Sequence, residues 1–368
     1  MERIEKQRGD MFLVMLLVVI LGVGITLLFS SSSSFSTRAY NDPLFLVKRQ
    51  LLWAGLGGAA AFIVSLTPLS VFRRWMPAIL LGTLAAVLLP FLPSVGTSVL
   101  GSRRWITLFG LSFQPSELVK LTLVLYLASY FARREEGQPI TMNALIPPFL
   151  VTCVFAGIVL IQNDYSTAIF ILVTGLAMMY ISQVRLLHFF LVTLYTVPLG
   201  FLLLFTREHR VQRLLAFFDP SNHSTGTGYQ IVTAKAALVS GGLFGKGLGR
   251  SAAKLGPLPM SYSDFIYTIV GEETGLLGAL FVLALFGLLA WRGYRIALLS
   301  KDRFSRAAAF GLTSALCLQA LLNMAVASGL VPTTGVTLPF FSAGGSSLFT
   351  TLVMCGLLVN LSRRVTDV

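Results

Sequence analysis

Charged residues are scarce in this chain of 368 residues, because only 12% are Asp, Glu, Lys or Arg while 55% are hydrophobic. A soluble domain usually carries about a quarter charged residues. So few charges cannot cover a globular surface with polar groups. The composition therefore excludes an ordinary soluble fold and indicates that lipid surrounds most of the chain.

Cysteine and histidine are also rare, with three residues of each. Cys153, Cys317 and Cys355 all fall within apolar runs, so the sequence suggests neither a disulfide framework nor a CxxC metal site. The histidines are scattered and form no ligand cluster. HExxH, P-loop and GxSxG sequences are missing, and zinc hydrolysis, nucleotide hydrolysis and serine-esterase chemistry therefore have no support.

Basic residues outnumber acidic ones by 28 to 15, which gives a net charge of +13. Most basic residues occur in short clusters at the ends of apolar runs, as in Arg73-Arg74 and Arg363-Arg364. This arrangement orients helices in a bilayer and does not form the continuous basic face of a nucleic-acid-binding protein. We therefore expect membrane lipid, and no nucleic acid, around the protein.

Ten apolar segments are predicted to be membrane-spanning helices. They lie near 11–30, 50–69, 77–93, 116–132, 145–161, 167–182, 187–206, 264–291, 307–330 and 345–362. The predicted fold is therefore all-α, with one transmembrane domain over residues 1–368. The first segment has no compelling cleavage site, so it is predicted to be a retained span and not a signal peptide. Because the number of spans is even, both termini are expected on one side.

The distribution of basic residues predicts that both termini are cytoplasmic. In that orientation the inside segments carry Arg3, Lys6, Arg8, Arg73, Arg74, Arg133, Arg134, Arg185, Arg292, Arg295, Lys301, Arg303, Arg306, Arg363 and Arg364. The short outside loops carry only Arg38, Lys48, Arg49, Arg103 and Arg104. The long segment 207–263, between spans seven and eight, then lies outside. It is rich in glycine and is expected to form short helices in the membrane interface.

Ionisable residues at membrane depth need a partner or a function, because burying a charge in lipid is costly. Glu117 and Lys120 share one helix face at the start of a predicted span, either as a self-neutralising pair or as part of a site. Asp164 either caps the following span or faces the site. Asp264 lies where the outside segment re-enters the membrane. It either caps the next span or accepts a proton from a hydroxyl.

Basic residues flank these carboxylates on the predicted outer surface. They are Arg104, Arg207, Arg210, Lys235, Lys246, Arg250 and Lys254. Cations around a few carboxylates suit a doubly charged phosphate leaving group, with one carboxylate acting as the base. Glu272 and Glu273 lie about two turns deeper than Asp264, and we expect them to bond to neighbouring helices without taking part in chemistry.

Several short motifs together resemble the SEDS family of peptidoglycan glycosyltransferases. In family order they are Arg104-Trp105-Ile106, Gln114-Pro115-Ser116-Glu117 with Lys120, Gly226-Thr227-Gly228-Tyr229-Gln230, Gly241-Gly242-Leu243-Phe244-Gly245-Lys246-Gly247-Leu248-Gly249, Asp264-Phe265-Ile266 with Gly271-Glu272-Glu273, Asn323, Pro332-Thr333-Thr334-Gly335, Leu338-Pro339 and Gly344-Gly345-Ser346-Ser347. Each motif alone is weak, but the set covers the chain from about residue 40 to its C-terminus and is very specific.

The resemblance implies an enzyme that joins lipid II units, in which a sugar hydroxyl of the acceptor displaces polyprenyl diphosphate from the donor. It implies that Asp264 is the general base, with Glu117, Lys120 and Asp164 as further catalytic residues. The residues expected to bind the substrate are Arg104, Gln114, Arg210, Lys246, Lys254, Ser346 and Ser347. Family analogy also allows a divalent cation, magnesium or manganese, on the diphosphate, although the sequence shows no ligand set for it.

The family has a division branch (FtsW-like) and an elongation branch (RodA-like). Asn41-Asp42-Pro43-Leu44-Phe45 and Gly247-Leu248-Gly249-Arg250-Ser251 resemble the division branch more closely. This resemblance implies a class B penicillin-binding protein (an FtsI-like transpeptidase) and other divisome membrane proteins as partners. The expected location is the inner membrane at the division septum, with the active site at the extracytoplasmic face.

The sequence departs from the family pattern next to two carboxylates. Asn163 precedes Asp164 where the family usually has proline, and Met260 and Tyr262 replace a Glu and a His before Asp264. Two other hypotheses stay open, a transporter that flips lipid II and a scaffold without chemistry. The candidate acids gather at one surface, whereas a transporter is expected to carry them near the midplane in both halves, so polymerisation is favoured.

Overall fold

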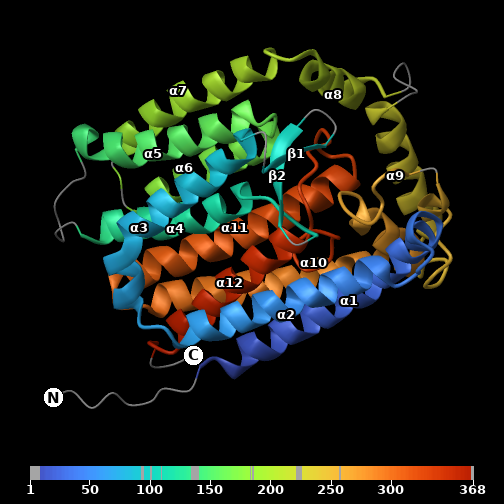
Figure 1. The fold of residues 1–368 in the computed structure, drawn as a ribbon, viewed down its shortest axis with the longest axis horizontal. Helices are drawn as coiled ribbons and strands as arrows, with labels where there is room; N and C mark the ends of the chain where they lie inside the picture. Colours follow the sequence, from blue (N-terminus) through green and yellow to red (C-terminus); the bar gives the residue numbers. More distant parts are fainter. Residues whose placement is uncertain are drawn as a thin grey trace.

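The computed structural model describes residues 9–92, 95–99, 102–108, 110–133, 141–182, 184, 186–220, 226–256 and 258–365. In this part of the chain, ten long helices lie side by side along the long axis of the molecule (Figure 1). They are α1 (Met11–Tyr40), α2 (Phe45–Leu66), α3 (Leu69–Leu88), α4 (Ser116–Ala132), α5 (Met142–Ile161), α6 (Tyr165–Ile181), α7 (Leu186–Leu204), α10 (Ile266–Leu299), α11 (Arg303–Ala327) and α12 (Gly345–Ser362).

The helices correspond one by one to the ten predicted spans, and the predicted polytopic helical fold is confirmed. Within the described ranges, seven helical stretches are long and apolar enough to cross a membrane, and α6 and α7 are apolar but shorter. The 17-residue α4 carries Glu117 in its first turn. Many large apolar side chains point outward, such as Leu81 and Leu298, which is the surface that lipid requires. Arg3, Lys6, Arg8, Arg134 and Arg185, used to predict the orientation, lie outside the described residues.

The core of the bundle is built around α12, which packs most extensively against α2. Nearly every side chain of α12 is buried. Glycine permits this close contact, because a Cβ atom at Gly356 would lie 2.4 Å from the backbone oxygen of Ala61. Small residues at such crossings let membrane helices pack backbone to backbone. The result is a rigid centre against which the loop before α12 is held.

A small antiparallel sheet between α3 and α4 was not predicted from the sequence. It consists of β1 (Gly96–Val99), β2 (Ser102–Leu108) and β3 (Leu111–Phe113), in that order. The β2 strand contains Trp, Ile and Thr, which favour extended backbone, and Gly110 turns the chain into β3 with φ of +77°. The sheet brings Arg104 on β2 toward the N-terminal ends of α4 and α6.

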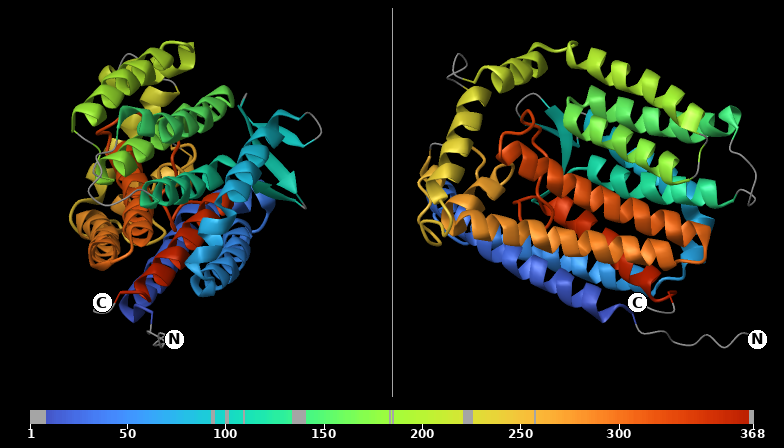
Figure 2. Two further views of the ribbon diagram at one scale, coloured as in Figure 1. Left: turned by 90° about the vertical axis from the view of Figure 1, so that its left-hand side faces the viewer. Right: turned by 180° about the vertical axis from the view of Figure 1, so that it is seen from behind.

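The long segment after α7 contains the short helices α8 (Glu208–Phe218) and α9 (Thr227–Gly241) and a 3-10 turn at Ala253–Leu255. Short helices were predicted here. Figures 1 and 2 show α8 and α9 at one end of the bundle, and the first turn of α1 and the last turn of α12 at the opposite end. This placement agrees with the even number of spans. Which end faces the cytoplasm stays a prediction.

Helix α10 is interrupted at Gly275, whose φ of 70° and ψ of −169° are not helical. The loop after α9 fills the break, because Leu276 N–H donates to the oxygen of Gly242 at 2.9 Å and Lys246 N–H donates to the oxygen of Glu272 at 3.0 Å. A Cβ atom at Gly275 would lie 2.4 Å from the backbone oxygen of Leu243, so only glycine fits. The first part of α10, which follows Asp264, is thus fixed to the loop.

Candidate active site

A cavity of about 1430 Å³ opens between α2, α4, α6, α7, α8, the sheet and the loop before α12. Pockets for small ligands usually measure about 300–1,000 Å³, so this cavity is large enough for a bigger substrate. One part of its wall is apolar and comes from α6 and α7. These lining residues are Leu172, Val173, Leu176, Val197, Phe201 and Leu204. The polar residues discussed next line another part of the wall, so the cavity suits an amphiphilic molecule.

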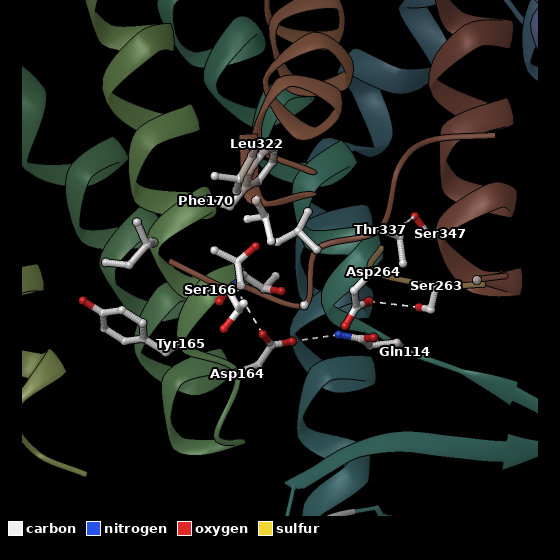
Figure 3. A pocket seen from close by; sticks show the side chains of 18 of the residues that line it. Gln114, Asp164, Tyr165, Ser166, Phe170, Ser263, Asp264, Leu322, Thr337 and Ser347 are labelled. Carbon is white, nitrogen blue, oxygen red and sulfur yellow. Dashed lines mark hydrogen bonds between the residues drawn. The ribbon is translucent and has the colours of Figure 1, made fainter. Parts of the chain in front are cut away.

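Asp164 both caps α6 and faces the cavity. Its Oδ1 accepts a hydrogen bond from Thr167 N–H at 3.2 Å, as the capping hypothesis predicts. Its Oδ2 accepts one from Gln114 Nε2 at 2.8 Å (Figure 3). The same oxygen forms an ion pair with Arg104 at 3.2 Å. The carboxylate therefore fixes Gln114 and Arg104, which come from two different elements, at the cavity wall.

Asp264 lies in the loop immediately before α10 and lines the same cavity (Figure 3). The helix starts at Ile266 with Phe265 as its N-cap residue, so the hypothesis that Asp264 caps this helix is wrong. Ser263 Oγ donates to Asp264 Oδ1 at 2.9 Å. The carboxyl group keeps partial access to the cavity, and burial on its other sides raises its pKa, although Ser263, Arg104 and Arg213 lower it. A carboxylate with a raised pKa is a better proton acceptor than an exposed one.

Glu117 and Lys120 form the ion pair that their spacing suggested, with 2.7 Å between Oε2 and Nζ. Both side chains are buried in the protein, and both line the cavity. Lys120 Nζ also donates to Gln319 Oε1 at 2.7 Å. The structure therefore supports the paired interpretation and also places the pair in the candidate site.

Cations outnumber carboxylates at the cavity wall. Basic lining residues are Arg49, Arg104, Lys120, Arg207, Arg210 and Arg213, and acidic ones are Glu117, Asp164 and Asp264. Arg210 also lies over the Tyr165 ring at 5.1 Å. Such an excess of donors with positive charge suits a substrate with phosphate groups.

Arg213 was missed in the sequence analysis. It lies on α8, where burial lowers its pKa while the nearby Asp264 and Asp164 carboxylates raise it. The signal was present, because Arg207, Arg210 and Arg213 are spaced by three residues and fall on one face of an amphipathic helix. That helix was predicted, but its orientation toward a cavity was not.

Gln114, Ser346 and Ser347, which were expected to bind the substrate, all line the cavity. Ser347 Oγ lies 2.9 Å from Thr337 Oγ1 and accepts a hydrogen bond from Gln319 Nε2 at 3.3 Å. In the ranges that the structure describes, no three His, Cys, Asp or Glu side chains are placed to hold a metal ion.

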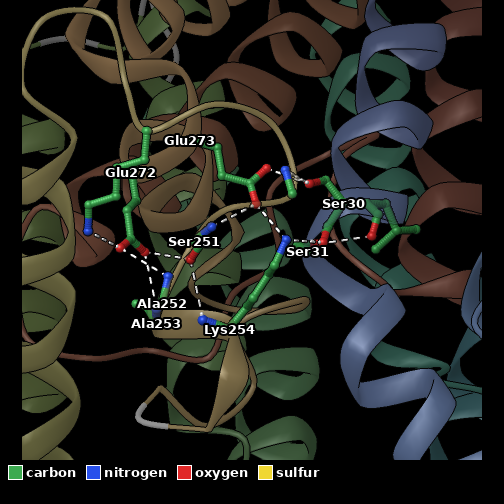
Figure 4. A network of polar contacts seen from close by, with 11 residues as sticks. Ser30, Ser31, Ser251, Ala252, Ala253, Lys254, Glu272 and Glu273 are labelled. Atoms are coloured by element: carbon green, nitrogen blue, oxygen red, sulfur yellow. Dashed lines mark hydrogen bonds and ion pairs between the residues drawn. The ribbon is translucent and has the colours of Figure 1, made fainter.

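Lys246 and Lys254 were also expected to bind the substrate, but neither lines this cavity. Lys246 forms an ion pair with Glu272 at 2.6 Å. Lys254 forms one with Glu273 at 2.7 Å (Figure 4). Ser30 on α1 donates to Glu273 as well. The two glutamates therefore bond mainly to the loop after α9 and only partly to a neighbouring helix. These contacts anchor the loop to α10 and α1 outside the candidate site.

Comparison with known proteins gives consistent matches over the whole chain. A family model described as "Cell cycle protein", named for FtsW, RodA and SpoVE, matches residues 10–367. A probable peptidoglycan glycosyltransferase FtsW of Geobacter sp. (strain M18) is 36% identical over 365 residues, which are 99% of both chains. Stage V sporulation protein E of Bacillus subtilis is 34% identical over 98% of both chains.

Solved structures agree with this result. A chain from a study described as "Structural coordination of polymerization and crosslinking by a peptidoglycan synthase complex" has a TM-score of 0.79 at 28% identity, covering 98% of this chain and 99% of that one. The rod shape determining protein RodA of Thermus thermophilus has a TM-score of 0.71 at 28% identity and covers 98% of both chains.

Proposed function

Because this chain belongs to the FtsW, RodA and SpoVE family of cell cycle proteins, we propose that it is a peptidoglycan glycosyltransferase that polymerises lipid II. The names of similar proteins support the glycosyltransferase activity. The observation that carries the choice of substrate is the cavity itself. It combines a carboxylate with a raised pKa, several cations and an apolar wall. A sugar linked through diphosphate to a polyprenyl chain presents the matching groups.

In the proposed reaction, Asp264 is the general base. Its carboxylate takes the proton of an acceptor sugar hydroxyl as the oxygen forms a bond to the anomeric carbon of the donor. The bond between that carbon and the diphosphate oxygen breaks, and polyprenyl diphosphate leaves with the electron pair. Arg104, Arg210 and Lys120 are placed to stabilise the negative charge that develops on the leaving group. Asp164 keeps Arg104 in position.

The apolar side chains of α6 and α7 are the proposed contact for the polyprenyl chain. They line the cavity next to its polar part. Such a chain gains free energy by leaving water, whereas its diphosphate needs cations, so one cavity with both surfaces orients the substrate. We place this end of the bundle at the extracytoplasmic face, because α8 and α9 belong to the segment that the positive-inside rule puts outside.

The proposed partner is a class B penicillin-binding protein at the division septum. Similarity to a chain of a peptidoglycan synthase complex supports a partner of this kind. The FtsW names of the curated relatives favour the division branch over the elongation branch. A fluorescent fusion of the protein should gather at midcell, and labelling along the side wall would favour the elongation branch.

The direct test is a polymerisation assay with purified protein, its transpeptidase partner and lipid II. We expect glycan strands of many disaccharides on a gel, together with release of polyprenyl diphosphate. A protein that moves labelled lipid II between leaflets but makes no polymer would favour the transporter hypothesis. A protein that binds its partner and does neither would favour the scaffold.

The pH dependence of the reaction tests the role of Asp264. A base must be ionised, and burial raises the Asp264 pKa, so the rate should fall as the pH decreases through this raised pKa. The positive charge of Arg104 lowers that pKa. Arg104→Gln should therefore move the acid limb of the kcat/KM profile to higher pH, whereas Arg49→Gln in the same cavity should leave it in place. An acid limb that does not move in Arg104→Gln would contradict this assignment.

A further inference from the structure

Helix α11 carries two buried amide side chains, Gln319 and Asn323, that face the candidate site. They are four residues apart and so lie one above the other on one helix face. Neither lines the cavity, so neither is placed to touch the substrate. Each instead bonds to a group that does line it. We call these two residues the α11 amide pair.

Gln319 connects three separate elements. Its Oε1 accepts a hydrogen bond from Lys120 Nζ on α4 at 2.7 Å, and its Nε2 donates to the backbone oxygen of Thr337 at 3.0 Å. The same Nε2 lies 3.3 Å from Ser347 Oγ at the start of α12. One amide thus fixes the ammonium group to the loop before α12.

These contacts leave Lys120 with a defined direction. In the described residues the ammonium group donates a hydrogen bond to Gln319 Oε1 at 2.7 Å and forms an ion pair with Glu117 Oε2 at 2.7 Å. Lys120 also lines the cavity, and its Nζ lies 5.4 Å from the centre of the Phe170 ring. Without Gln319 the ammonium group would lose its hydrogen bond to α11 and keep only the contacts with Glu117 and Phe170.

Asn323 connects Asp264 to the loop before α12. Its Nδ2 donates to the backbone oxygen of Asp264 at 2.9 Å and to that of Val336 at 2.7 Å. Its Oδ1 is buried and has no partner in the described part of the chain. An unpaired buried oxygen lowers the stability of the folded protein, so stability alone does not explain an asparagine at this position. Local rules are broken most often where function needs it.

We propose that the α11 amide pair consists of positioning residues that fix Lys120 and Asp264 at the cavity wall. The inference rests on the proposed function, because it assumes that both groups act on one substrate. Gln319 fixes the orientation of the Lys120 ammonium group, and Asn323 fixes the position of the Asp264 backbone. Both also bond to the loop at Val336 and Thr337, so the two groups share one support.

The test compares Gln319→Leu and Asn323→Leu with the wild-type protein, each in complex with its transpeptidase partner and supplied with lipid II. Both substitutions keep the approximate volume and remove the hydrogen bonds. We expect kcat to fall at least about tenfold with KM changed by less than about twofold, because orientation of reacting groups affects the transition state most. Gln319→Glu keeps an acceptor for Lys120 and should lose less activity than Gln319→Leu.

Thr313→Val is the matched control on the same helix. Thr313 is fully buried, and its hydroxyl donates only to the backbone oxygen of Ala309 in its own helix. We expect its kcat to stay at the wild-type value. Thermal unfolding of every variant separates a loss of folded protein from a loss of rate.

Three outcomes would overturn the proposal. They are an unchanged kcat in both leucine variants, losses of activity that only follow the folded fraction, and equal losses in Gln319→Leu and Gln319→Glu. Absence of polymer from the wild-type protein is a different result, because it contradicts the proposed function and not the role of the amide pair.

Discussion

Replacement of Asp264 by Asn should abolish glycan polymerisation, with a rate about 10²–10⁴ times lower than in the wild-type protein. The amide has nearly the same shape and can still contact Ser263, but it cannot take a proton from an acceptor hydroxyl. Because Asp264 does not cap α10, the helix should keep its stability. The measurement is polymer formed from lipid II over time, with partner binding followed by size-exclusion chromatography.

Asp42→Asn is a suitable control for this experiment. Asp42 forms an exposed ion pair with Lys48 at 2.7 Å near the start of α2, and such surface pairs contribute little to stability. We expect this variant to polymerise lipid II at the wild-type rate. Normal polymer from Asp264→Asn would remove Asp264 from the mechanism, whereas loss of polymer in both variants would point to a general defect.

The second large effect is expected at the Glu117–Lys120 ion pair. Lys120→Met should lower the free energy of unfolding by about 3–5 kcal/mol, because the charge of Glu117 then stays buried without its partner. The same variant should be inactive, since the cavity loses one of the cations that we propose for the diphosphate of the substrate. Thermal unfolding in detergent and polymerisation of lipid II measure the two effects separately.

The double variant Glu117→Gln/Lys120→Met distinguishes stability from catalysis. Removal of both charges leaves no unpaired ion, so most of the lost stability should return. Activity should not return, because the cation is still missing. A double variant that is both stable and active would show that the pair serves the fold alone.

The helices were largely predictable from the sequence because each span carries its own signal. Pro115-Ser116 marks a helix start, and the predicted bounds of α4 and α12 agree with the structure. The carboxylates Asp164 and Asp264 could be found in the same way, since a charge next to an apolar run requires an explanation. Local sequence was sufficient for these features.

The remaining features depend on contacts between distant residues. The sheet requires pairing of short strands that carry no strong periodicity, such as Gly96 with Ile106. Lys246 and Lys254 looked like substrate contacts because their partners, Glu272 and Glu273, follow 26 and 19 residues later. Only the folded chain shows that these charges neutralise each other. Arg213 was missed because its spacing from Arg210 indicates a shared helix face, whereas only the folded chain shows that this face lines the cavity.

The interruption of α10 at Gly275 connects Asp264, the proposed general base, to α9 through the loop that follows α9. The loop between Gly242 and Gly247 is joined to α10 on both sides of the interruption, and these joints are made by main-chain atoms. A displacement of α9 would therefore be transmitted through these hydrogen bonds to the first part of α10, next to Asp264. Most side-chain substitutions in this loop would leave this connection in place, because main-chain atoms make its hydrogen bonds. Lys246→Pro would weaken it, since the N–H that bonds to Glu272 would be lost while that of Gly247 still bonds to Glu273.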